Sequence, residues 1–369
     1  MDEDLDLEKL LKYSLDTWLF KQGEMVSLVI HLGHRLGLYE AMDGVGNITS
    51  EDLAESTECH ERWILEWLRC NAAAGLIKTS DGSNFELEPE AAAVLAQSDQ
   101  PTYAAAVFAN LKPIEVIDGI AEAFKTGIGL SYDGQGDGSE HAVEAMCGPM
   151  SKALLVSQVL PLLNGVEDKM RKGARVIDVG CGTGLAIELL ADSFPESTFI
   201  GYDPSSRAIA VARERFSSYE NVELFAIGAE SIPDSADADF VMTLDCLHDM
   251  PRPDLALKAI HGALKEDGTL LVKEIKSSAT WTDNLRNPVL ALMYATSITT
   301  CLSSAMSDTD TLGLGTLGLN PDLLSAMIKE AGFTFFHDAT QLIHSRIVVI
   351  SFQSETDKPI TFPNGNYRK

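Results

Sequence analysis

The chain has 369 residues, of which 45% are hydrophobic and 22% charged, as in ordinary folded domains. That length is enough for two domains. Its formal net charge of −27 argues against the basic surface that nucleic acid or an anionic membrane would need, so we expect neither as a partner. The most apolar stretch, 288–302, is too short to span a bilayer.

Six cysteines are scattered along the chain without the paired spacing of a disulfide framework or a zinc site. We therefore expect reduced thiols and a cytoplasmic protein. The acidic start, Met1-Asp2-Glu3-Asp4, is unlike a signal or transit peptide. The cysteines are Cys59, Cys70, Cys147, Cys181, Cys246 and Cys301.

The first hundred residues predict a winged helix, which is a helix, a turn, a second helix and a two-stranded wing. Met25–Leu38 has apolar residues at helical spacing. Thr49 is a hydroxyl cap for the helix that follows it, and 62–74 predicts the next helix. A hairpin is expected around Asp81–Asn84. We assign 1–100 to a mostly helical winged-helix domain.

A winged helix raises DNA binding as a function, but the charge of this one opposes it. Residues 1–100 contain seven basic and twenty acidic side chains. The expected recognition helix carries Arg62 and Arg69 beside Glu61 and Glu66, so it is not expected to neutralise several phosphates. The apolar N-terminal helices favour dimerisation instead, and we expect a homodimer.

Residues 101–172 are mostly helical, with a break rich in glycine and aspartate at 132–138. We expect this linker to cover the ligand pocket of the domain that follows. From 173 to 353, strands alternate with helices, which predicts an α/β fold with a doubly wound parallel sheet. The expected strands are Arg175–Val179, Thr198–Tyr202, Val222–Ile227, Asp239–Leu244, Thr269–Glu274, Phe333–His337 and Ser345–Phe352.

Three further segments complete this domain and the chain. We expect a helical insert at 275–320 and a last helix at Asp322–Ala331 that stops at a glycine. The tail, 354–369, is expected to be disordered.

The stretch Asp178–Gly184 joins an expected strand to an expected helix through alternating glycines. Glycine lets the chain turn at positive φ and lets a ligand lie against the backbone at a helix N-terminus. A dinucleotide site would need its third glycine at position 185, which is Leu. The glycines and the preceding acid resemble motif I of class I S-adenosylmethionine (SAM)-dependent methyltransferases, which implies a SAM site.

A second acid supports the same interpretation. Asp203 ends the next expected strand, nineteen residues beyond the last glycine. At that spacing a carboxylate can accept hydrogen bonds from both hydroxyls of a ribose.

These motifs, together with 239–249 and 264–270, resemble those of winged-helix class I SAM-dependent methyltransferases of the O-methyltransferase-like kind. The resemblance runs from about residue 20 to 353 and is greatest to a poorly characterised branch with a long insert after the fifth strand. It implies a Rossmann-like, seven-stranded sheet whose last strand is antiparallel. It also implies SAM as cofactor and a small molecule as methyl acceptor.

The resemblance assigns the cofactor contacts by position. Asp178 would orient the methionine end of SAM, Gly180, Cys181, Gly182 and Gly184 would line the loop beneath it, and Asp203 would hold the ribose. Relatives often carry an aspartate for the adenine amino group where this chain has Gly228. The adenine would then rely on backbone at Ala229 or on Glu230. Asp245 could contact the amino group or organise His248.

The resemblance also indicates His248 as a general base, since it follows the fourth strand in a Leu247-His248-Asp249 step. A hydroxyl becomes a good nucleophile when it loses its proton, and imidazole can take that proton near neutral pH. The alternative is a capping or packing role for His248.

Some alternatives stay open at this point. A base-free N- or S-methyltransferase and a SAM-binding regulator without turnover would share the cofactor motifs. Tyr132 and Met293 are weaker candidates for lining the acceptor pocket. His31 and His34 share a helix face, but no third ligand is evident, so we predict no metal site.

Overall fold

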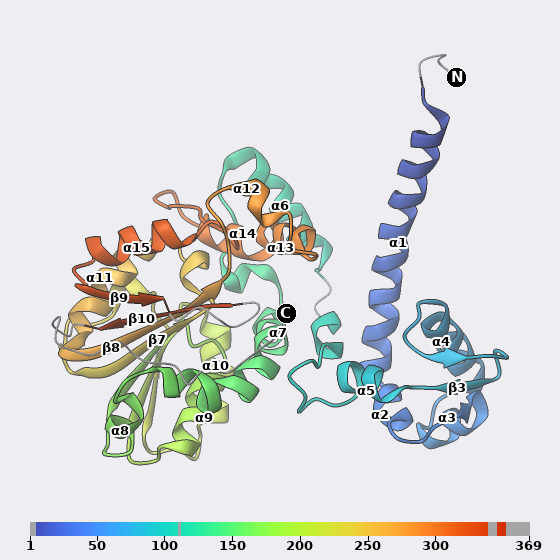
Figure 1. The fold of residues 1–369 in the computed structure, drawn as a ribbon, viewed down its shortest axis with the longest axis horizontal. Coiled ribbons are helices and arrows are strands. Elements are labelled where there is room, and N and C mark those ends of the chain that lie inside the picture. Colours follow the sequence, from blue (N-terminus) through green and yellow to red (C-terminus); the bar gives the residue numbers. More distant parts are fainter. Residues whose placement is uncertain (1–4, 110–111, 339–344, 352–369) are drawn as a thin grey trace, which may run out of the picture. The chain divides into compact units, whose positions relative to one another are not determined.

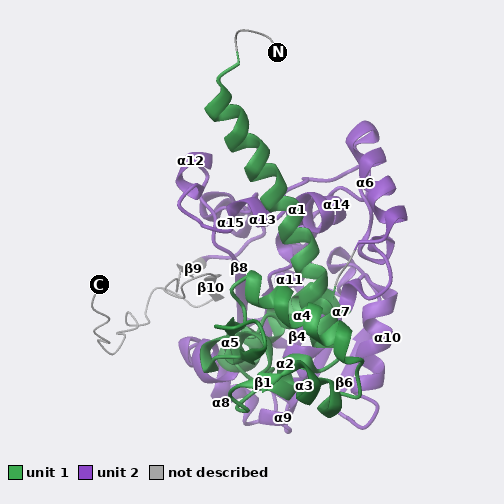
Figure 2. Ribbon diagram, turned by 90° about the vertical axis from the view of Figure 1, so that its right-hand side faces the viewer, with its two compact units in different colours: residues 1–111, 141–154 green, residues 112–140, 155–369 purple. Residues whose placement is uncertain are grey.

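The computed structural model describes residues 5–109, 112–338 and 345–351. The chain divides into two compact units, 1–111 with 141–154 and 112–140 with 155–369 (Figure 2). The stretch 101–172, expected to be one linker, thus contributes to both units. The tail expected to be disordered lies outside the described residues.

The first unit begins with a long helix, α1 (Leu7–Arg35), which starts well before the expected Met25. Asp6 caps it by accepting hydrogen bonds from two backbone N–H groups of the first turn, which explains the earlier start. The following helices are α2 (Leu38–Met42), α3 (Ser50–Ser56), α4 (Glu61–Ala73) and α5 (Pro89–Leu95).

The expected wing is present, and a third short strand joins it. The sheet order is β1 (Ile48–Thr49), β3 (Asn84–Glu86) and β2 (Lys78–Thr79). Thr49 caps α3 as predicted, its hydroxyl accepting from the N–H of Asp52. Helix α1 approaches the core closely at Gly33, where a Cβ would lie 2.6 Å from the ring of Trp67.

The second unit contains a seven-stranded sheet in the order β6-β5-β4-β7-β8-β10-β9 (Figure 1). Strands β4 to β8 are parallel, and β10 is antiparallel to both of its neighbours. The predicted α/β fold with an antiparallel last strand is confirmed. The strands are β4 (Arg175–Val179), β5 (Thr198–Tyr202), β6 (Val222–Phe225), β7 (Ala238–Leu244), β8 (Leu264–Ile275), β9 (Phe335–Asp338) and β10 (Ser345–Ser351).

Three strand ends differ from the prediction by two residues or more. β6 stops at Phe225, two residues early. β8 begins at Leu264 because Leu264 pairs with Ala238 ahead of a register shift. β9 begins two residues later than expected, since Phe333 is buried against the ring of His261 instead.

Helices cover both faces of the sheet, as doubly wound folds require. Figure 1 places α8 (Val166–Met170), α9 (Leu185–Ser193) and α10 (Ser206–Arg215) on one face. α11 (Pro253–Ala263) and α15 (Pro321–Glu330) lie on the other face, where their apolar side chains join the main hydrophobic core. The candidate site is formed by the loops that follow the carboxyl ends of the strands.

The expected insert is helical only in part, and it packs against residues 112–140 of the same unit. It contains α12 (Trp281–Asn284) and a continuous run of α13 (Leu290–Thr296), the π-helical η7 (Ser297–Cys301) and α14 (Leu302–Ala305). Gly129 N–H donates to the carbonyl of Met306 at 2.8 Å, and Leu130 N–H donates to Ser303 Oγ at 2.8 Å. Between α6 (Ile114–Thr126) and α7 (Ser139–Leu154), the expected break forms a 3₁₀ helix, η2 (Tyr132–Gln135).

Candidate functional site

The glycine loop turns where the sequence predicted, and its three glycines serve different purposes. All have positive φ, 77° at Gly180, 54° at Gly182 and 86° at Gly184. A Cβ at Gly180 would lie 2.7 Å from Cys246 Sγ, and one at Gly184 would lie 2.5 Å from a ring carbon of Phe216. Gly182 faces open space, so its backbone is accessible to a ligand.

Asp178 lies at the end of β4 and is only 2% exposed. Its Oδ1 is buried and has no hydrogen-bond partner. Burial, together with the nearby charge of Asp203, raises its pKa to about 8. A buried carboxyl with an unpaired oxygen is costly for folding, which indicates a partner that arrives with a ligand.

Asp203 connects the glycine loop to the loop that follows β5. Its Oδ2 accepts a hydrogen bond from the N–H of Gly182 at 2.9 Å, and its Oδ1 accepts from the N–H of Ser205 at 2.8 Å. Burial raises the pKa of Asp203, although these two hydrogen bonds act in the opposite direction. The carboxylate is therefore fixed against the glycine loop, beside the accessible backbone of Gly182.

The positions expected near an adenine lie in and beside η5 (Ala229–Ser231). Ala229 is buried, and Glu230 is exposed. The Glu230 carboxylate folds back over Gly228, into the space that a side chain at position 228 would occupy. Glu230 also lines a groove beside α11, together with Ile232, Asp234, Leu255, Lys258, Ala259 and Gly262.

Asp245 and Cys181 have local partners. Asp245 follows β7 with φ 54°, a conformation that is uncommon for residues other than glycine. One of its carboxylate oxygens pairs with Lys273, while the other, Oδ1, is buried without a hydrogen-bond partner. Cys181 is buried, and its Sγ lies against Gly201, where a Cβ would meet it at 2.7 Å.

His248 lies in the short helix η6 (Leu247–Asp249) and is 2% exposed. Its Nδ1 is 2.6 Å from Oε2 of Glu274, and Glu274 Oε1 accepts from the N–H of Leu247 at 2.9 Å. Burial alone would lower the pKa of His248, but the Asp249 and Glu274 carboxylates outweigh it and raise that pKa well above 6.5. Glu274 thus fixes the ring and leaves Nε2 for other partners.

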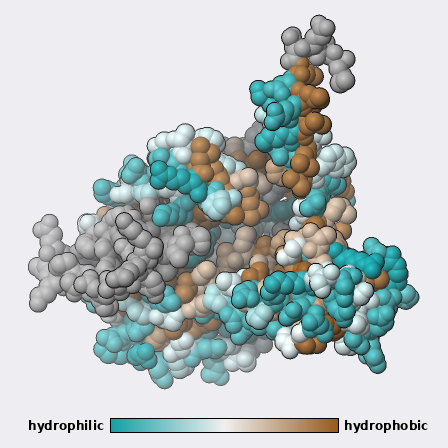
Figure 3. Space-filling model, turned by 45° about the vertical axis from the view of Figure 1, so that its right-hand side comes forward, coloured by the Kyte–Doolittle hydropathy of each residue, from teal (hydrophilic) through white to brown (hydrophobic). Residues whose placement is uncertain are grey.

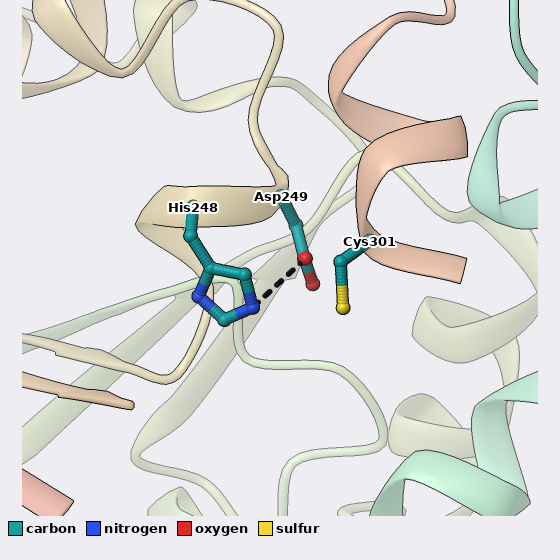
Figure 4. A group of neighbouring side chains, drawn as sticks. All are labelled: His248, Asp249 and Cys301. Carbon is teal, nitrogen blue, oxygen red and sulfur yellow. Dashed lines mark ion pairs between the residues drawn. The ribbon is translucent and has the colours of Figure 1, made fainter. Parts of the chain in front are cut away.

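Around Nε2 lie Asp249 and Cys301 (Figure 4). Asp249 Oδ1 is 3.0 Å from Nε2, but the contact lacks the alignment of a hydrogen bond. Burial would raise the pKa of Asp249, yet the charge of His248 and the hydrogen bond from Tyr132 lower it. Tyr132 Oη donates to Asp249 Oδ2 at 2.5 Å. Tyr132, one of the two weaker candidates for lining the acceptor pocket, therefore lies at the candidate site. The other, Met293, contacts Asn287 instead.

Residues 132–137 also contact the loop after β5. Ser205 Oγ donates to Asp133 Oδ1 at 2.5 Å, and the guanidinium of Arg207 pairs with Asp137 at 2.5 Å. Through Tyr132 and Asp133, one segment thus joins the His248 region to the Asp203 region. Part of the expected linker lies over the strand ends in the way that a pocket cover would.

Sequence reasoning missed Glu274 and Cys301. The signal for Glu274 was present, because it is a buried acid just after the apolar run Leu270–Val272, at the carboxyl end of β8. Cys301 gave no such signal, since it lies within an insert whose path does not follow from spacing.

Comparison with known proteins agrees with this geometry. Residues 170–316 match the family model described as a methyltransferase domain, and 24–97 match the Rv2258c-like winged HTH domain. This chain combines a winged helix with a methyltransferase domain. The glycine loop, Asp203 and His248 all lie within the methyltransferase domain.

Curated relatives match about a third of this chain. Trans-aconitate 2-methyltransferase of Variovorax paradoxus is 32% identical over 124 residues, which cover 34% of this chain and 44% of that enzyme. Ubiquinone/menaquinone biosynthesis C-methyltransferase of Campylobacter jejuni is 32% identical over 111 residues, which cover 28% of this chain and 46% of the enzyme. This chain therefore spans less than half the length of either relative.

Solved structures resemble the whole winged-helix methyltransferase fold. An O-methyltransferase family protein from Burkholderia thailandensis has a TM-score of 0.62 at 17% identity, over 95% of this chain and 99% of its own. Human N-acetylserotonin methyltransferase, solved with SAM, has a TM-score of 0.60 at 17% identity, over 95% and 99%. Mitomycin 7-O-methyltransferase MmcR has 0.59 at 20%, over 94% and 98%. At these identities the likeness establishes the fold.

Proposed function

We propose that the protein transfers a methyl group from SAM to a hydroxyl oxygen of a small molecule, and that His248 is the general base. The observation that carries this proposal is the buried Glu274–His248 pair, with 2.6 Å between Oε2 and Nδ1, at the carboxyl ends of β7 and β8. Ligands bind at that edge in open α/β sheets.

S-adenosyl-L-methionine is the cofactor, and the residues present fit it. It supplies a methyl group on a positively charged sulfur and carries an ammonium. Asp178 offers an unpaired carboxylate oxygen for a cation, and Gly182 offers accessible backbone. Asp203 is fixed where a ribose is held in Rossmann-like sites. We infer that Ala229 or Glu230 borders the adenine and that Asp245 Oδ1 faces the methionine end.

The protein's own contribution to the reaction is positioning and one proton transfer. Glu274 holds Nδ1 of His248, so Nε2 can accept the hydroxyl proton of the acceptor once the imidazolium has released its own proton to solvent. The two carboxylates that raise the pKa of His248 also stabilise the imidazolium that forms. Tyr132 fixes Asp249 beside that atom. An acceptor that is already nucleophilic, such as an amine or thiol, would need no base.

The cofactor assignment is tested by calorimetry with S-adenosylhomocysteine (SAH) and with NAD, the ligand of the other Rossmann-like sites. We expect SAH to bind and NAD not to bind, because the loop lacks the third glycine of the dinucleotide motif. An Asp203→Asn variant is expected to bind SAH more weakly, since a neutral amide accepts hydrogen bonds from ribose less strongly than a carboxylate. Binding of NAD but not SAH would contradict the proposal.

A SAM-binding regulator is the second candidate function, because the chain contains a winged HTH domain. The contacts of the expected recognition helix argue against DNA as its target. Arg62 pairs with Glu66 at 2.6 Å, and the Arg69 guanidinium donates to the carbonyl of Gly82. Both arginines thus have partners within the chain, which supports the enzyme over the regulator.

We further propose a homodimer that forms through α1. Leu11, Leu15, Trp18 and Met25 follow the four-three spacing of a helix–helix seam, and each is at least half exposed. Figure 3 shows apolar side chains gathered along one side of this helix. A helix with such a face is stable when a partner covers it.

A charge on that face is expected to break the dimer. Leu15→Glu should change the mass measured by light scattering from dimer to monomer, because burying an unpaired carboxylate is costly. Thr17→Glu, one of the exposed polar positions of the same helix, is the control and should remain dimeric. An unchanged dimer in Leu15→Glu would place the interface elsewhere.

Two observations bear on location. All six cysteines lie in the described part of the chain, and none forms a disulfide. No helix in the described ranges has the length and apolar character needed to cross a membrane. The free thiols support our proposal of a cytoplasmic protein.

A further inference from the structure

Three side chains of the kinds that bind transition metals meet beside the Glu274–His248 pair. They are His248, Asp249 and Cys301, and one donor atom from each lies within 4.8 Å of the others. All three residues are buried. In Figure 4 the Asp249 carboxylate lies between the imidazole and the thiol. The proposed methyl transfer makes no use of Cys301.

A second observation concerns the Asp249 oxygen in this cluster. Asp249 Oδ1 is buried and forms an ion pair with Nε2 of His248 at 3.0 Å, but it accepts no hydrogen bond. Buried carboxylate oxygens are normally satisfied by hydrogen bonds or by a bound cation. This oxygen also faces Nε2, the ring nitrogen that Glu274 does not contact.

The outer contacts of the cluster match those of metal sites. Metal-bound histidine usually donates its other ring N–H to a carboxylate, and here Nδ1 is 2.6 Å from Glu274. A ligand carboxylate is usually hydrogen-bonded in turn, and Tyr132 Oη donates to Asp249 Oδ2 at 2.5 Å. Cys301 comes from the π-helical η7, and such π-helical turns are frequent at functional sites.

We propose that His248 Nε2, Asp249 and Cys301 Sγ bind a divalent transition-metal ion of the zinc class, with the fourth position open. A thiolate, an imidazole and a carboxylate suit zinc, whereas magnesium and calcium prefer oxygen alone. Tetrahedral zinc holds its ligand atoms roughly 3.3–3.8 Å apart, so small side-chain movements complete the site. On binding, the thiol and any imidazolium release their protons to solvent, and no redox step is involved.

The ion would occupy the lone pair that the general base uses, so zinc should inhibit methyl transfer. This consequence rests on the proposed function, whereas metal binding does not. The two can therefore fail separately.

The binding test uses the full chain, freed of metal with a chelator and titrated with Co²⁺ and then with Zn²⁺. We expect one Co²⁺ per chain with the near-ultraviolet absorption of a cobalt–thiolate bond, and displacement of Co²⁺ by Zn²⁺. Cys301→Ser should lose that absorption and weaken Zn²⁺ binding at least tenfold, because a thiolate ligand is removed. Cys70→Ser, which removes a thiol from α4, should behave like the unchanged protein.

Each outcome of this titration either supports or contradicts the proposed metal site. Absence of Co²⁺ binding, binding without thiolate absorption, or equal Zn²⁺ affinity in Cys301→Ser would overturn it. SAH affinity should be nearly the same with and without Zn²⁺, since Asp178, Gly182 and Asp203, the main proposed cofactor contacts, come from the ends of β4 and β5. If the metal binds as expected but the rate of methyl transfer with Zn²⁺ equals that with chelator, the metal site stands and His248 is not the base.

Discussion

Replacing His248 by Ala is expected to lower kcat by two to four powers of ten, the usual effect of losing a general base. The acceptor needed for this measurement can be found by incubating the protein with radiolabelled SAM and a metabolite extract. SAH affinity should change little, because the main proposed cofactor contacts, Asp178, Gly182 and Asp203, come from the ends of β4 and β5. That separation of kcat from cofactor affinity distinguishes loss of a base from general damage to the site.

Two further variants sharpen this prediction. Glu274→Gln removes the carboxylate that holds Nδ1, so it should also lower kcat, though by less, because Nε2 keeps its lone pair. His31→Ala is the histidine control, since His31 belongs to α1 of the other unit, and its kcat should be unchanged. A His248→Ala protein that turns over at the normal rate would reduce His248 to a packing residue and favour an N- or S-acceptor.

Replacing Asp178 by Asn is expected to stabilise the cofactor-free protein while weakening SAH binding. The folded-state pKa of about 8 lies above the ordinary 3.8, so the folded protein holds a proton that the unfolded chain releases. The associated cost is absent below pH 4, grows as the pH rises and is complete near pH 8. At pH 7 it is on the order of 4 kcal/mol, and the neutral amide removes it. The melting temperature at pH 7 should rise by several degrees.

The same substitution tests the proposed ammonium contact. Loss of the charged partner should weaken SAH binding by about 10- to 100-fold. In the unchanged protein a cation favours ionised Asp178, so SAH affinity should fall as the pH drops below about 8, by up to about tenfold per pH unit. Asp178→Asn should lose this dependence.

The matched control is Asp168→Asn, which makes the same charge change at an exposed position of the same unit. It should leave both melting temperature and SAH affinity unchanged. If Asp178→Asn bound SAH as tightly as the unchanged protein at every pH, Asp178 would not contact the ammonium.

How far the sequence could predict the site depends on how local each part is. The glycine loop and Asp203 follow from spacing because each lies at the end of a strand whose direction the pattern reveals. Glu274 reaches His248 through the pairing of β7 with β8, where Leu244 lies opposite Lys273. The register between two strands depends on the tertiary structure, and no local pattern in the sequence predicts it.

The fold shows the same division. The seven expected strands of the second unit exist, and their ends moved where pairing or packing, rather than propensity, decides them, as at Phe333. The start of α1 was missed because its apolar residues before Met25 are exposed, so their helical spacing does not mark a face that packs on a core. Cys301 is the furthest from prediction, since a π-helical turn sets the direction of its side chain.

The chain passes between its two units three times, after residues 111, 140 and 154. Neither unit is therefore one continuous segment of the chain, and a single cut cannot separate the two units for exchange. A fragment starting at Leu155 would keep every strand of the large sheet yet lose Tyr132 and Asp133, and with them the hydrogen bonds to Asp249 and Ser205. An exchange of the winged helix between relatives must therefore leave 112–140 in place with the methyltransferase domain. We expect the two units to be inherited together for this reason.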